Sequence, residues 1–430
     1  MSWPTVSIVV TTYNGRNQLE PCLTALASLD YPADRFQVVV VDNASTDDTW
    51  AFVARRFPWV RVVRNTQNLG FAAGNNRGFQ VAPADFFVTL NNDTVVTSDW
   101  LRELVRPALD DRRVGLTTGK LIFLHNRLRI SLSRAASEPG RLASQPVAWL
   151  DDHPTPVDVL GPADPAHLPL GVRIPVGSRP TVLRLELDVP GRRQVLVSVD
   201  DGSRRPGTVG PKGTLVVPIA PDVPIRPVIQ NAGSLVFRDG RGCDRGAIVG
   251  PGFQYYTDDW GQFDRTEQVF AGCGASLLIR GSLLTDIGGF DERFFMYYED
   301  TDLSWRARLR GWKVVYAAQA VVRHAHRAST SGWTDRFVYY TERNRLLMLL
   351  KLARSRRALW QVGKATGAAA YAALEAAGRA GRGLESDRPV QPRWAALADV
   401  ARLWSETAAK RAQIRARRTV SDGEIERWLE

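Results

Sequence analysis

Four short runs of β-branched and aromatic residues within the first 124 positions most constrain the fold of this chain. They are VSIVVTT (6–12), FQVVVV (36–41), VRVV (60–63) and FFVTL (86–90). Such runs are too short and too dense in apolar residues for exposed helices, and they are typical of buried strands. Between the first two lies a leucine stripe at helical spacing, made of Leu19, Leu23, Leu26 and Leu29. This alternation predicts an α/β fold, with a mostly parallel sheet and helices on both faces.

The rest of the chain changes composition twice. Residues 125–226 are rich in proline and glycine and carry alternating strand patterns, so we expect an inserted all-β module there, such as a sandwich. The α/β pattern returns over 227–330, and residues 331–430 are rich in Ala, Arg and Leu and are predicted to be helical. With 1–124 as the first half of the α/β domain, the chain has four predicted regions, because 430 residues exceed one compact core.

The charge of the chain is strongly basic. It has 56 Lys and Arg against 45 Asp and Glu, a net charge of +11. This excess suits phosphorylated ligands, an anionic membrane surface or nucleic acid, and charge alone does not choose among them. Nucleic acid is disfavoured because the arginines are dispersed and the sequence has no recognition motif. The basic run KRAQIRARR (410–418) either solvates a packed helix or binds a membrane surface.

Cysteine usage and hydropathy favour a cytoplasmic protein. Cys22, Cys243 and Cys273 lie far apart without CxxC spacing, which is typical of free thiols in a reducing compartment. The apolar run at the N-terminus is short and follows no basic segment, so it is predicted to be a strand and not a signal peptide. No stretch approaches the roughly 18 apolar residues of a membrane-spanning helix. We expect a cytoplasmic location, with peripheral binding to the inner face of the cell membrane as an extension of it.

Polar residues follow three of the predicted strands. In sheets of this kind, ligands lie beyond the carboxyl ends of the strands. The segment Thr12-Tyr13-Asn14 follows the first strand without a GxGxxG pattern, which disfavours a dehydrogenase. Asp42 ends the second strand, where its carboxylate either accepts the imide N–H of a pyrimidine base or caps the next helix. Asp93 brings the only charge of the NND turn after the fourth strand, and one carboxylate plus substrate phosphates is a usual arrangement for Mg²⁺.

A glycine- and asparagine-rich turn, NLGFAAGNNRGF (68–79), leads into the next predicted helix. Its small residues allow close approach of a ligand to the backbone. The amide groups at a helix N-terminus suit a diphosphate. By itself the turn is weak evidence for a diphosphate site, and its place near the other strand ends strengthens that evidence.

The segment GFDERFFMYYEDTDLSWR (289–306) gathers five acids, and a helix is predicted to begin near Asp300. Acids at a helix N-terminus are often only caps, but this number exceeds what capping requires. An ionised carboxylate here suits a base that removes a proton from a hydroxyl. His324 follows the next predicted strand, two positions before His326, and one of the pair is predicted to bind a metal.

Together these segments resemble the inverting glycosyltransferases of family 2, which have a GT-A type fold. The motifs TTYN, VVDNASTDDT, NLGFAAGNN, LNND, GASLLIR and GGFDERFFMYYEDTDLSWR, and the final His, occur in that family's order. The resemblance covers 1–124 and 227–330. It is closest to the bacterial rhamnosyl- and galactofuranosyltransferases that build cell-wall or surface polysaccharides.

The resemblance implies a role for each motif. Thr12, Tyr13, Asn14 and Asp42 would hold the nucleotide, and Asn68, Gly70 and Asn75 would lie along the donor sugar. Asp93 and His324 would bind a divalent cation, Mg²⁺ or Mn²⁺, and Asp300 would be the catalytic base. The acids on the acceptor side would be Asp291, Glu292 and Glu299. Asn91 stands where a full DxD motif has its first acid, and the QxxRW motif of processive synthases is absent, which implies transfer of a single sugar.

The expected donor is dTDP-rhamnose, with a UDP-sugar as second choice, and the expected acceptor is a polyprenyl-diphosphate-linked saccharide or glycan. Two alternatives remain open at this point. A sugar- or polysaccharide-binding protein on a degenerate transferase scaffold would use the β module, and Asn91 favours it slightly. A sugar-nucleotidyltransferase is weaker, because TTYNGRNQ is not the glycine-rich basic loop which that chemistry leads us to expect.

Overall fold

The computed structural model describes residues 3–134, 147–160, 167–187, 193–199, 204–209, 213–250, 253–325, 334–380, 382 and 390–430. The chain forms two compact units. Unit 1 contains residues 1–121, 231–245 and 264–430, and unit 2 contains residues 122–230 and 246–263. The predicted β module, 125–226, thus lies inside unit 2, which also includes a second, later segment. The predicted helical region, 331–430, lies inside unit 1.

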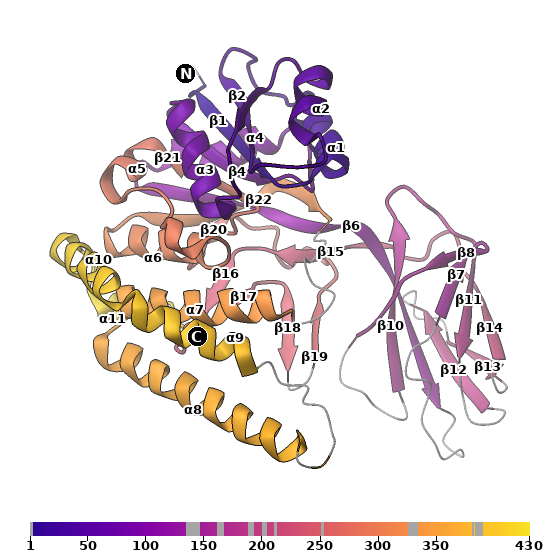
Figure 1. Ribbon diagram of the computed structural model, residues 1–430. Helices are drawn as coiled ribbons and strands as arrows, with labels where there is room; N and C mark the ends of the chain where they lie inside the picture. Colours follow the sequence, from indigo (N-terminus) through magenta and orange to yellow (C-terminus); the bar gives the residue numbers. More distant parts are fainter. Residues whose placement is uncertain are drawn as a thin grey trace. The chain divides into compact units, whose positions relative to one another are not determined.

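The first four strands of unit 1 form the parallel part of its sheet. They are β1 (Val6–Thr12), β2 (Phe36–Asp42), β3 (Arg61–Arg64) and β4 (Phe86–Asn91), in the order β3-β2-β1-β4. The helices α1 (Arg16–Leu26), α2 (Thr49–Arg56) and α3 (Gly70–Val81) connect them (Figure 1). Strand side chains such as Ile8, Val40 and Val88 are fully buried, as expected for a sheet covered on both faces. The predicted α/β fold is confirmed.

Antiparallel strands extend this sheet beyond β4. Strand β21 (Ser276–Arg280) lies between β4 and the first residues of β6 (Val114–Arg134). Strand β22 (Lys313–His324) pairs with the short β5 (Thr94–Val96), with His324 opposite Thr94. This register places the end of β22 beside the turn that follows β4, although the two are far apart in sequence. Helix α4 (Trp100–Asp110) packs beside β22, with Trp100 and Leu104 in the core.

The helices of the C-terminal region pack on the same unit. They are α7 (Asp335–Leu352), α8 (Ser355–Ala380), α9 (Val390–Arg402), α10 (Trp404–Arg417) and α11 (Asp422–Glu426). With α6 (Glu299–Leu309) they share an apolar core that includes Phe294, Trp305, Leu349, Val400 and Ile425. Figure 1 shows α7 to α11 gathered below the sheet. Among the described residues, no helix combines the length and the hydropathy needed to cross a membrane.

The described residues of unit 2 form two larger antiparallel sheets. One is β14-β11-β7-β8, and in the other β6 pairs with β10 on one side and β12 on the other. Their bounds are β7 (Val147–Leu150), β8 (His153–Thr155), β10 (His167–Pro175), β11 (Val182–Leu187), β12 (Arg193–Val199) and β14 (Gly213–Pro218). Buried side chains of both sheets, such as Leu128 and Leu185, form one core. The second segment adds the hairpin of β18 (Ala247–Gly250) and β19 (Phe253–Tyr256).

Candidate active site

The ends of the parallel strands form the floor of the candidate site. Strands β1, β2 and β4 run in the same direction, so Thr12, Asp42 and Asn91 reach the same edge of the sheet. The side-chain amide of Asn92 donates to Thr12 Oγ1 at 2.9 Å, which joins the turn after β1 to the turn after β4. A Cβ atom at Gly15 would lie 2.2 Å from Asn92 Nδ2 and 2.3 Å from Thr12 Oγ1. This close approach requires glycine.

The turn after β1 is held by the turn after β2. Asn14 adopts a left-handed backbone, with φ of 51°, which asparagine tolerates better than most residues. Its amide donates to Ser45 Oγ at 2.8 Å, and its Oδ1 accepts from the amide of Thr46 at 2.8 Å. Tyr13, next to it, is half exposed. The predicted base-binding residues therefore lie on two mutually braced turns, with one aromatic ring accessible to a ligand.

Asp42 is fully buried, and its two oxygens have different surroundings. Oδ1 accepts from the amide of Ser45 at 3.1 Å, which holds the turn after β2 but does not cap α2, because that helix begins at Thr49. Oδ2 lies 3.7 Å from Arg64 Nε, and within the described chain it has no hydrogen-bond partner. Buried polar atoms are nearly always satisfied, so this oxygen fits a donor on a bound ligand. Asp42 can therefore hold the turn through Oδ1 and bind a ligand through Oδ2, because each interaction uses a different oxygen.

The glycine-rich turn contacts the chain in a way that the sequence did not predict. Amide groups of Phe71 and Ala72, at the start of α3, donate to the backbone oxygen of Phe295 at 2.7 and 3.2 Å. These two amides are therefore already paired within the protein, and the contact of this turn with a diphosphate stays a prediction. Asn68 Oδ1 accepts from the Gly70 amide at 2.9 Å. Asn75 is fully buried and donates to the backbone oxygen of Phe71, so it acts within α3.

The turn after β4 and the end of β22 bring a carboxylate and an imidazole together. His324 Nε2 lies 2.9 Å from Asp93 Oδ1 and 3.3 Å from Asn91 Nδ2. The amide of Ala325 donates to the backbone oxygen of Asp93 at 2.9 Å, which fixes the end of β22 against the turn. Both side chains are largely buried. His326, the second histidine considered above, lies outside the described residues.

This pair fits one edge of a divalent cation site. Asp93 Oδ1 and His324 Nε2, 2.9 Å apart, would be an oxygen donor and a nitrogen donor to such a cation. The described residues contain no group of three or more His, Cys, Asp or Glu side chains placed to hold a metal ion. Phosphate oxygens and water would have to supply the other ligands, as is usual where a cation binds with a diphosphate.

Asp300 lies at the start of α6, beside strand β21. Its Oδ2 accepts from the amide of Gly274 at 2.8 Å, and its Oδ1 accepts from the amide of Thr301 at 2.6 Å. Burial raises the pKa of Asp300 and the charge of Asp244 acts in the same direction, while these hydrogen bonds act to lower it. The net effect is a pKa above the usual range for aspartate. A carboxylate in this state is a stronger base than an exposed one.

A short backbone path connects Asp300 with the Asp93–His324 pair. The amide of Asn91 donates to the backbone oxygen of Ala275 at 3.1 Å, and Gly274 next to it donates to Asp300. A Cβ atom at Gly274 would lie 3.1 Å from the ring of Phe71. The candidate base, the candidate metal ligands and the start of α3 are thus joined through Gly274 and Ala275.

The three acids predicted for the acceptor side have different surroundings. Glu299 is buried, and burial raises its pKa well above the usual range, with the charge of Asp300 acting in the same direction. Its Oε2 has no hydrogen-bond partner within the described chain. Glu292 is exposed and accepts from Asn76 Nδ2 at 3.0 Å. Exposure therefore leaves Glu292 accessible to an acceptor, whereas Glu299 is enclosed by the protein.

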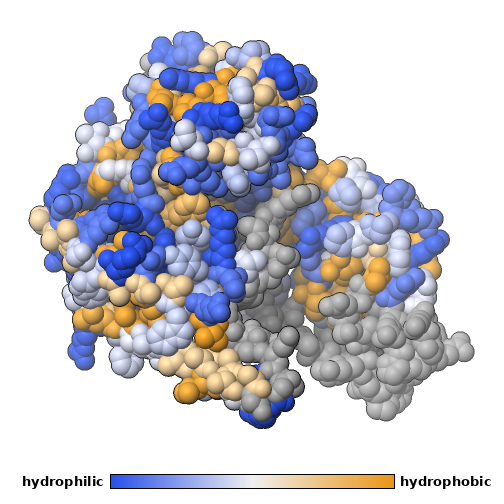
Figure 2. Space-filling model, viewed as in Figure 1, coloured by the Kyte–Doolittle hydropathy of each residue, from blue (hydrophilic) through white to orange (hydrophobic). Residues whose placement is uncertain are grey.

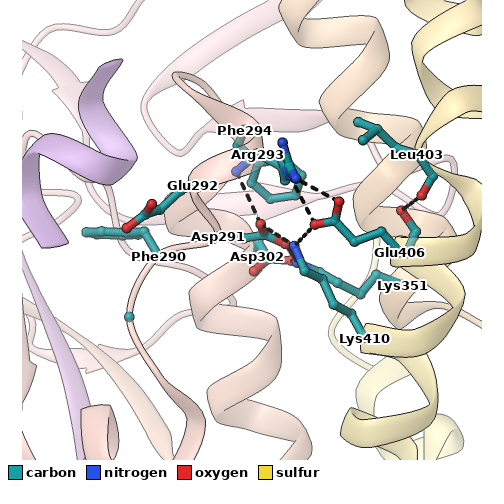
Figure 3. A network of polar contacts seen from close by, with 12 residues as sticks. Phe290, Asp291, Glu292, Arg293, Phe294, Asp302, Lys351, Leu403, Glu406 and Lys410 are labelled. Carbon is teal, nitrogen blue, oxygen red and sulfur yellow. Dashed lines mark hydrogen bonds and ion pairs between the residues drawn. The ribbon is translucent and has the colours of Figure 1, made fainter. Parts of the chain in front are cut away.

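Asp291 belongs to a network of ion pairs with the C-terminal helices (Figure 3). Lys351 Nζ, buried on α7, lies 2.6 Å from Asp291 and 2.6 Å from Asp302. Lys410 on α10 lies 2.8 Å from Asp291, and Arg306 lies 2.7 Å from Asp302. The network joins the segment before Asp300 to helices α6, α7 and α10.

The backbone immediately before Asp300 is strained. Phe295, Tyr297 and Tyr298 have φ of 64°, 68° and 69°, a conformation that costs bulky residues roughly 1–3 kcal/mol each. The side-chain amide of Asn344, fully buried on α7, lies 2.8–2.9 Å from the backbone oxygens of Phe294, Met296 and Tyr297. Such strain persists only where surrounding contacts enforce it, and here α7 supplies them.

Sequence reasoning missed Asn344, Lys351 and Asp244. Lys351 and Asn344 lie in the helical run RNRLLMLLKL, where polar residues resemble the solvated face of an amphipathic helix. Asp244 lies in the short strand β17 (Gly242–Asp244) without a motif around it. The one available signal was the aromatic run FFMYY, because bulky side chains in a tight segment need external support.

Two family models match the chain. "Glycosyl transferase family 2" matches residues 7–142, and "Glycosyltransferase like family 2" matches residues 259–345. Together they cover just over half of the 430 residues. The matched stretches contain both sides of the site, from Thr12 to Asp93 and from Gly274 to His324.

Curated relatives match over shorter segments. An N-acetylglucosaminyl-diphospho-decaprenol L-rhamnosyltransferase of Mycobacterium tuberculosis is 49% identical over 59 residues, 14% of this chain and 19% of that protein. Glycosyltransferase AglE of Haloferax volcanii is 28% identical over 126 residues, 28% of this chain and 41% of that protein. The chain thus spans less than half the length of these relatives.

Solved structures resemble the chain at low identity. A mannosyltransferase of Pyrobaculum calidifontis in complex with GDP-Man and Mn²⁺ aligns with 96% of this chain and 86% of its own, at 15% identity and a TM-score of 0.43. GalNAc-T7 with UDP, GalNAc and Mn²⁺ aligns with 81% of this chain and 48% of its own, at 14% identity and a TM-score of 0.46. The assignment of the chain to a family rests on the two family models and on the motifs within the residues that they match. The chain belongs to glycosyltransferase family 2.

Proposed function

We propose that this chain is an inverting, metal-dependent glycosyltransferase that moves one sugar at a time from a nucleotide-sugar donor. One observation carries the proposal. Asp300, a carboxylate with a raised pKa, is joined through Gly274 and Ala275 to the turn on which Asp93 and His324 lie 2.9 Å apart. A base and a metal-binding pair in one site are what attack of a hydroxyl on a sugar diphosphate requires.

The donor would occupy the edge of the parallel sheet. Thr12, Tyr13 and Asn14 would line the pocket of the base, and Asp42 Oδ2 would accept the imide N–H of a pyrimidine, since it lacks a hydrogen-bond partner within the described chain. Asn68 and Gly70 would lie along the donor. Asn75 would act indirectly, through its hydrogen bond to Phe71 in α3.

The diphosphate would lie at Asp93 and His324. A bound Mg²⁺ or Mn²⁺ would neutralise the charge that develops on the departing nucleoside diphosphate. Mn²⁺ suits a site with an imidazole ligand better than Mg²⁺ does, because Mg²⁺ prefers oxygen. Asn91 brings no charge, so the protein's own contribution to the site is one carboxylate and one imidazole.

Asp300 would take the proton of the acceptor hydroxyl. The hydroxyl oxygen then forms a bond to the anomeric carbon from the face opposite the leaving group, while the bond from that carbon to the diphosphate oxygen breaks. The configuration at the anomeric carbon is inverted. Glu292, which is exposed, would contact the acceptor, whereas the burial of Glu299 assigns it a supporting role next to Asp300.

We infer dTDP-rhamnose as the donor, with a UDP-sugar as second choice. The support is the activity of the mycobacterial relative, an N-acetylglucosaminyl-diphospho-decaprenol L-rhamnosyltransferase. The acceptor proposed here is a polyprenyl-diphosphate-linked saccharide or glycan in cell-wall or surface polysaccharide synthesis. Such an acceptor places the reaction at the inner face of the cell membrane.

The test is calorimetric titration of the purified chain with dTDP and with UDP, each with and without Mn²⁺ or Mg²⁺. Metal-dependent binding of one nucleotide, and turnover of the matching sugar nucleotide, is the expected result. Asp93→Asn should remove the metal dependence, while Asp99→Asn, on the surface at the start of α4, should leave it unchanged. Absence of binding to both nucleotides would contradict the proposal and favour a glycan-binding protein on a transferase scaffold.

A further inference from the structure

The basic run 410–418, which the sequence offered for membrane binding, makes hydrogen bonds and ion pairs with other parts of the protein. Arg411 donates to the backbone oxygens of Leu350 and Ala353, and Arg415 binds Asp422. Arg417 lies 3.2 Å from Asp286, and Lys410 is part of the Asp291 network. The cations of 410–418 thus hold α10 on α7 and α11. A membrane-binding surface has to be sought elsewhere.

Helix α8 (Ser355–Ala380) offers such a surface. The most exposed large apolar side chains of the described residues are Leu374 at 74%, Trp360 at 67% and Tyr371 at 59%, and all three are on this helix. Their spacing, 360, 371 and 374, places them within one arc of an α-helix. The surface along α8, at the lower edge of Figure 2, is largely in apolar and intermediate colours.

The opposite face of α8 packs on the protein through small residues. Ala358, Ala365, Ala369 and Ala372 are buried and follow helical spacing. On the exposed face, Gly363 and Gly367 would accept a Cβ atom with nothing within 4 Å, so no described part of the chain covers them. The helix is therefore amphipathic: its alanine face is buried, and Trp360 and Leu374 are exposed on its outer face.

The charges on the outer face of α8 indicate what kind of partner binds there. Arg356 and Lys364 are exposed, and each lies one helical turn from Trp360. Tryptophan and tyrosine combine an apolar ring with a polar group, which suits the boundary between lipid headgroups and acyl chains. Cations beside such rings are attracted to anionic headgroups. A second copy of the chain would instead bring the same cations to its own apolar face.

We propose that the outer face of α8, formed by Trp360, Gly367, Tyr371 and Leu374 with Arg356 and Lys364 beside it, docks on an anionic lipid bilayer. The helix would lie in the plane of the membrane surface, with its alanine face on the protein. This inference would place a lipid-linked acceptor beside the enzyme. It rests on α8 alone and not on the proposed donor or base.

The test is sedimentation of the full chain with vesicles of phosphatidylcholine alone and of phosphatidylcholine mixed with phosphatidylglycerol, without donor or acceptor. The chain should bind the anionic vesicles and be released by salt, because exposed charges are screened. Leu374→Glu should weaken binding by about tenfold or more, since it places a charge on the apolar face. The matched control is Leu109→Glu, an exposed leucine on α4, which should bind as the unchanged chain does.

Several results would overturn the inference. They are equal binding by Leu374→Glu and Leu109→Glu, equal binding to both kinds of vesicle, or no binding at all. A concentration-dependent dimer that Leu374→Glu disrupts, without vesicle binding, would show that a second copy covers the face. Nucleotide titration of the same variants separates this outcome from the proposed function, because binding of dTDP or UDP needs no contact with α8.

Discussion

Two neighbouring acids at the start of α6, Glu299 and Asp300, lie in different surroundings. Asp300 accepts hydrogen bonds from the amides of Gly274 and Thr301, which stabilise its charged form against the effect of burial. Glu299 is buried without a partner for Oε2 in the described chain, and burial raises its pKa well above the ordinary value. Burial thus raises the pKa of both groups, and the hydrogen bonds to Asp300 oppose that rise.

Asp300→Asn should remove the proposed base while keeping a side chain of nearly the same shape. We expect turnover to fall by roughly 10²–10⁴-fold, the usual contribution of a general base. In the unchanged enzyme, kcat/KM should fall as the pH drops through the pKa of Asp300, and this acid limb should lie above the roughly 3.9 of an ordinary aspartate, because burial raises that pKa. The measurements are the pH profile of kcat/KM and calorimetric affinity for the donor nucleotide. Near-normal turnover by the variant would contradict the assignment.

Glu299→Gln should change how stability depends on pH. The folded protein raises the pKa of Glu299, so it binds this proton more tightly than the unfolded chain does, and stability falls as the pH rises from the unfolded pKa toward the folded one. The variant has no such proton and should lose less stability than the unchanged chain over that range. Urea unfolding at several pH values measures the difference. Glu292→Gln, at an exposed position, is the matched control, and parallel pH profiles for the unchanged chain and Glu299→Gln would contradict the prediction.

At the scale of elements, the segment from Gly289 to Glu299 connects three helices. It caps α3 through the backbone oxygen of Phe295, leads into α6, and is held by Asn344 and Lys351 of α7. Because the backbone at Phe295, Tyr297 and Tyr298 is strained, contacts from α7 have to maintain it. Helix α7 thereby positions Asp300 without contacting it through any interaction described above.

Asn344→Ala should leave backbone oxygens of Phe294, Met296 and Tyr297 without this donor. A buried acceptor left unpaired costs about 1–3 kcal/mol, so the free energy of unfolding should fall by at least that amount. Turnover per folded molecule should fall as well, because relaxation of the segment would move Asp300. The matched control is Gln361→Ala, a buried amide on α8. Lower stability with unchanged kcat in Asn344→Ala would limit the role of this residue to folding.

Lys351→Met should leave Asp291 and Asp302 without the cation between them. Removal of one partner from a buried ion pair costs about 3–5 kcal/mol. Burial acts to raise the pKa of Asp291, but the ion pairs with Lys351 and Lys410 outweigh it and hold the pKa well below the usual range. The stability from this group is therefore present above about pH 4 and is lost as the pH falls further.

Unfolding by urea at pH 7 and at pH 3 measures this effect. The variant should be less stable than the unchanged chain at pH 7, and the difference should be smaller at pH 3. Lys364→Met, at an exposed position on α8, is the control and should match the unchanged chain at both pH values. A constant difference between the two pH values would contradict the role assigned to the Asp291 ion pairs.

At the scale of the whole molecule, local sequence patterns predicted the parallel strands and the residues at their ends. This was possible because short stretches of sequence indicate which strands are buried and in which direction they run. They also predicted that Asp93 and His324 belong to one site, through the order of family motifs. They did not predict that Phe295 occupies the amides of Phe71 and Ala72, or that Asn344 supports FFMYY. Such hydrogen bonds depend on which backbone groups tertiary packing brings together. The spacing of apolar residues along the sequence does not predict them.

The place of β21 in the sheet affects how the chain can be synthesised. Leu90 of β4 pairs with Ser276 of β21, and Thr118 of β6 pairs with Leu277, so a strand made late lies between two made early. As the nascent chain leaves the ribosome, all of unit 2 emerges before β21 does. Until then the edge of β4 is an unpaired template for other strands, a known route to aggregation. Translation therefore leaves an interval in which this open edge of β4 has to be shielded. The interval ends only when the chain has grown past Arg280.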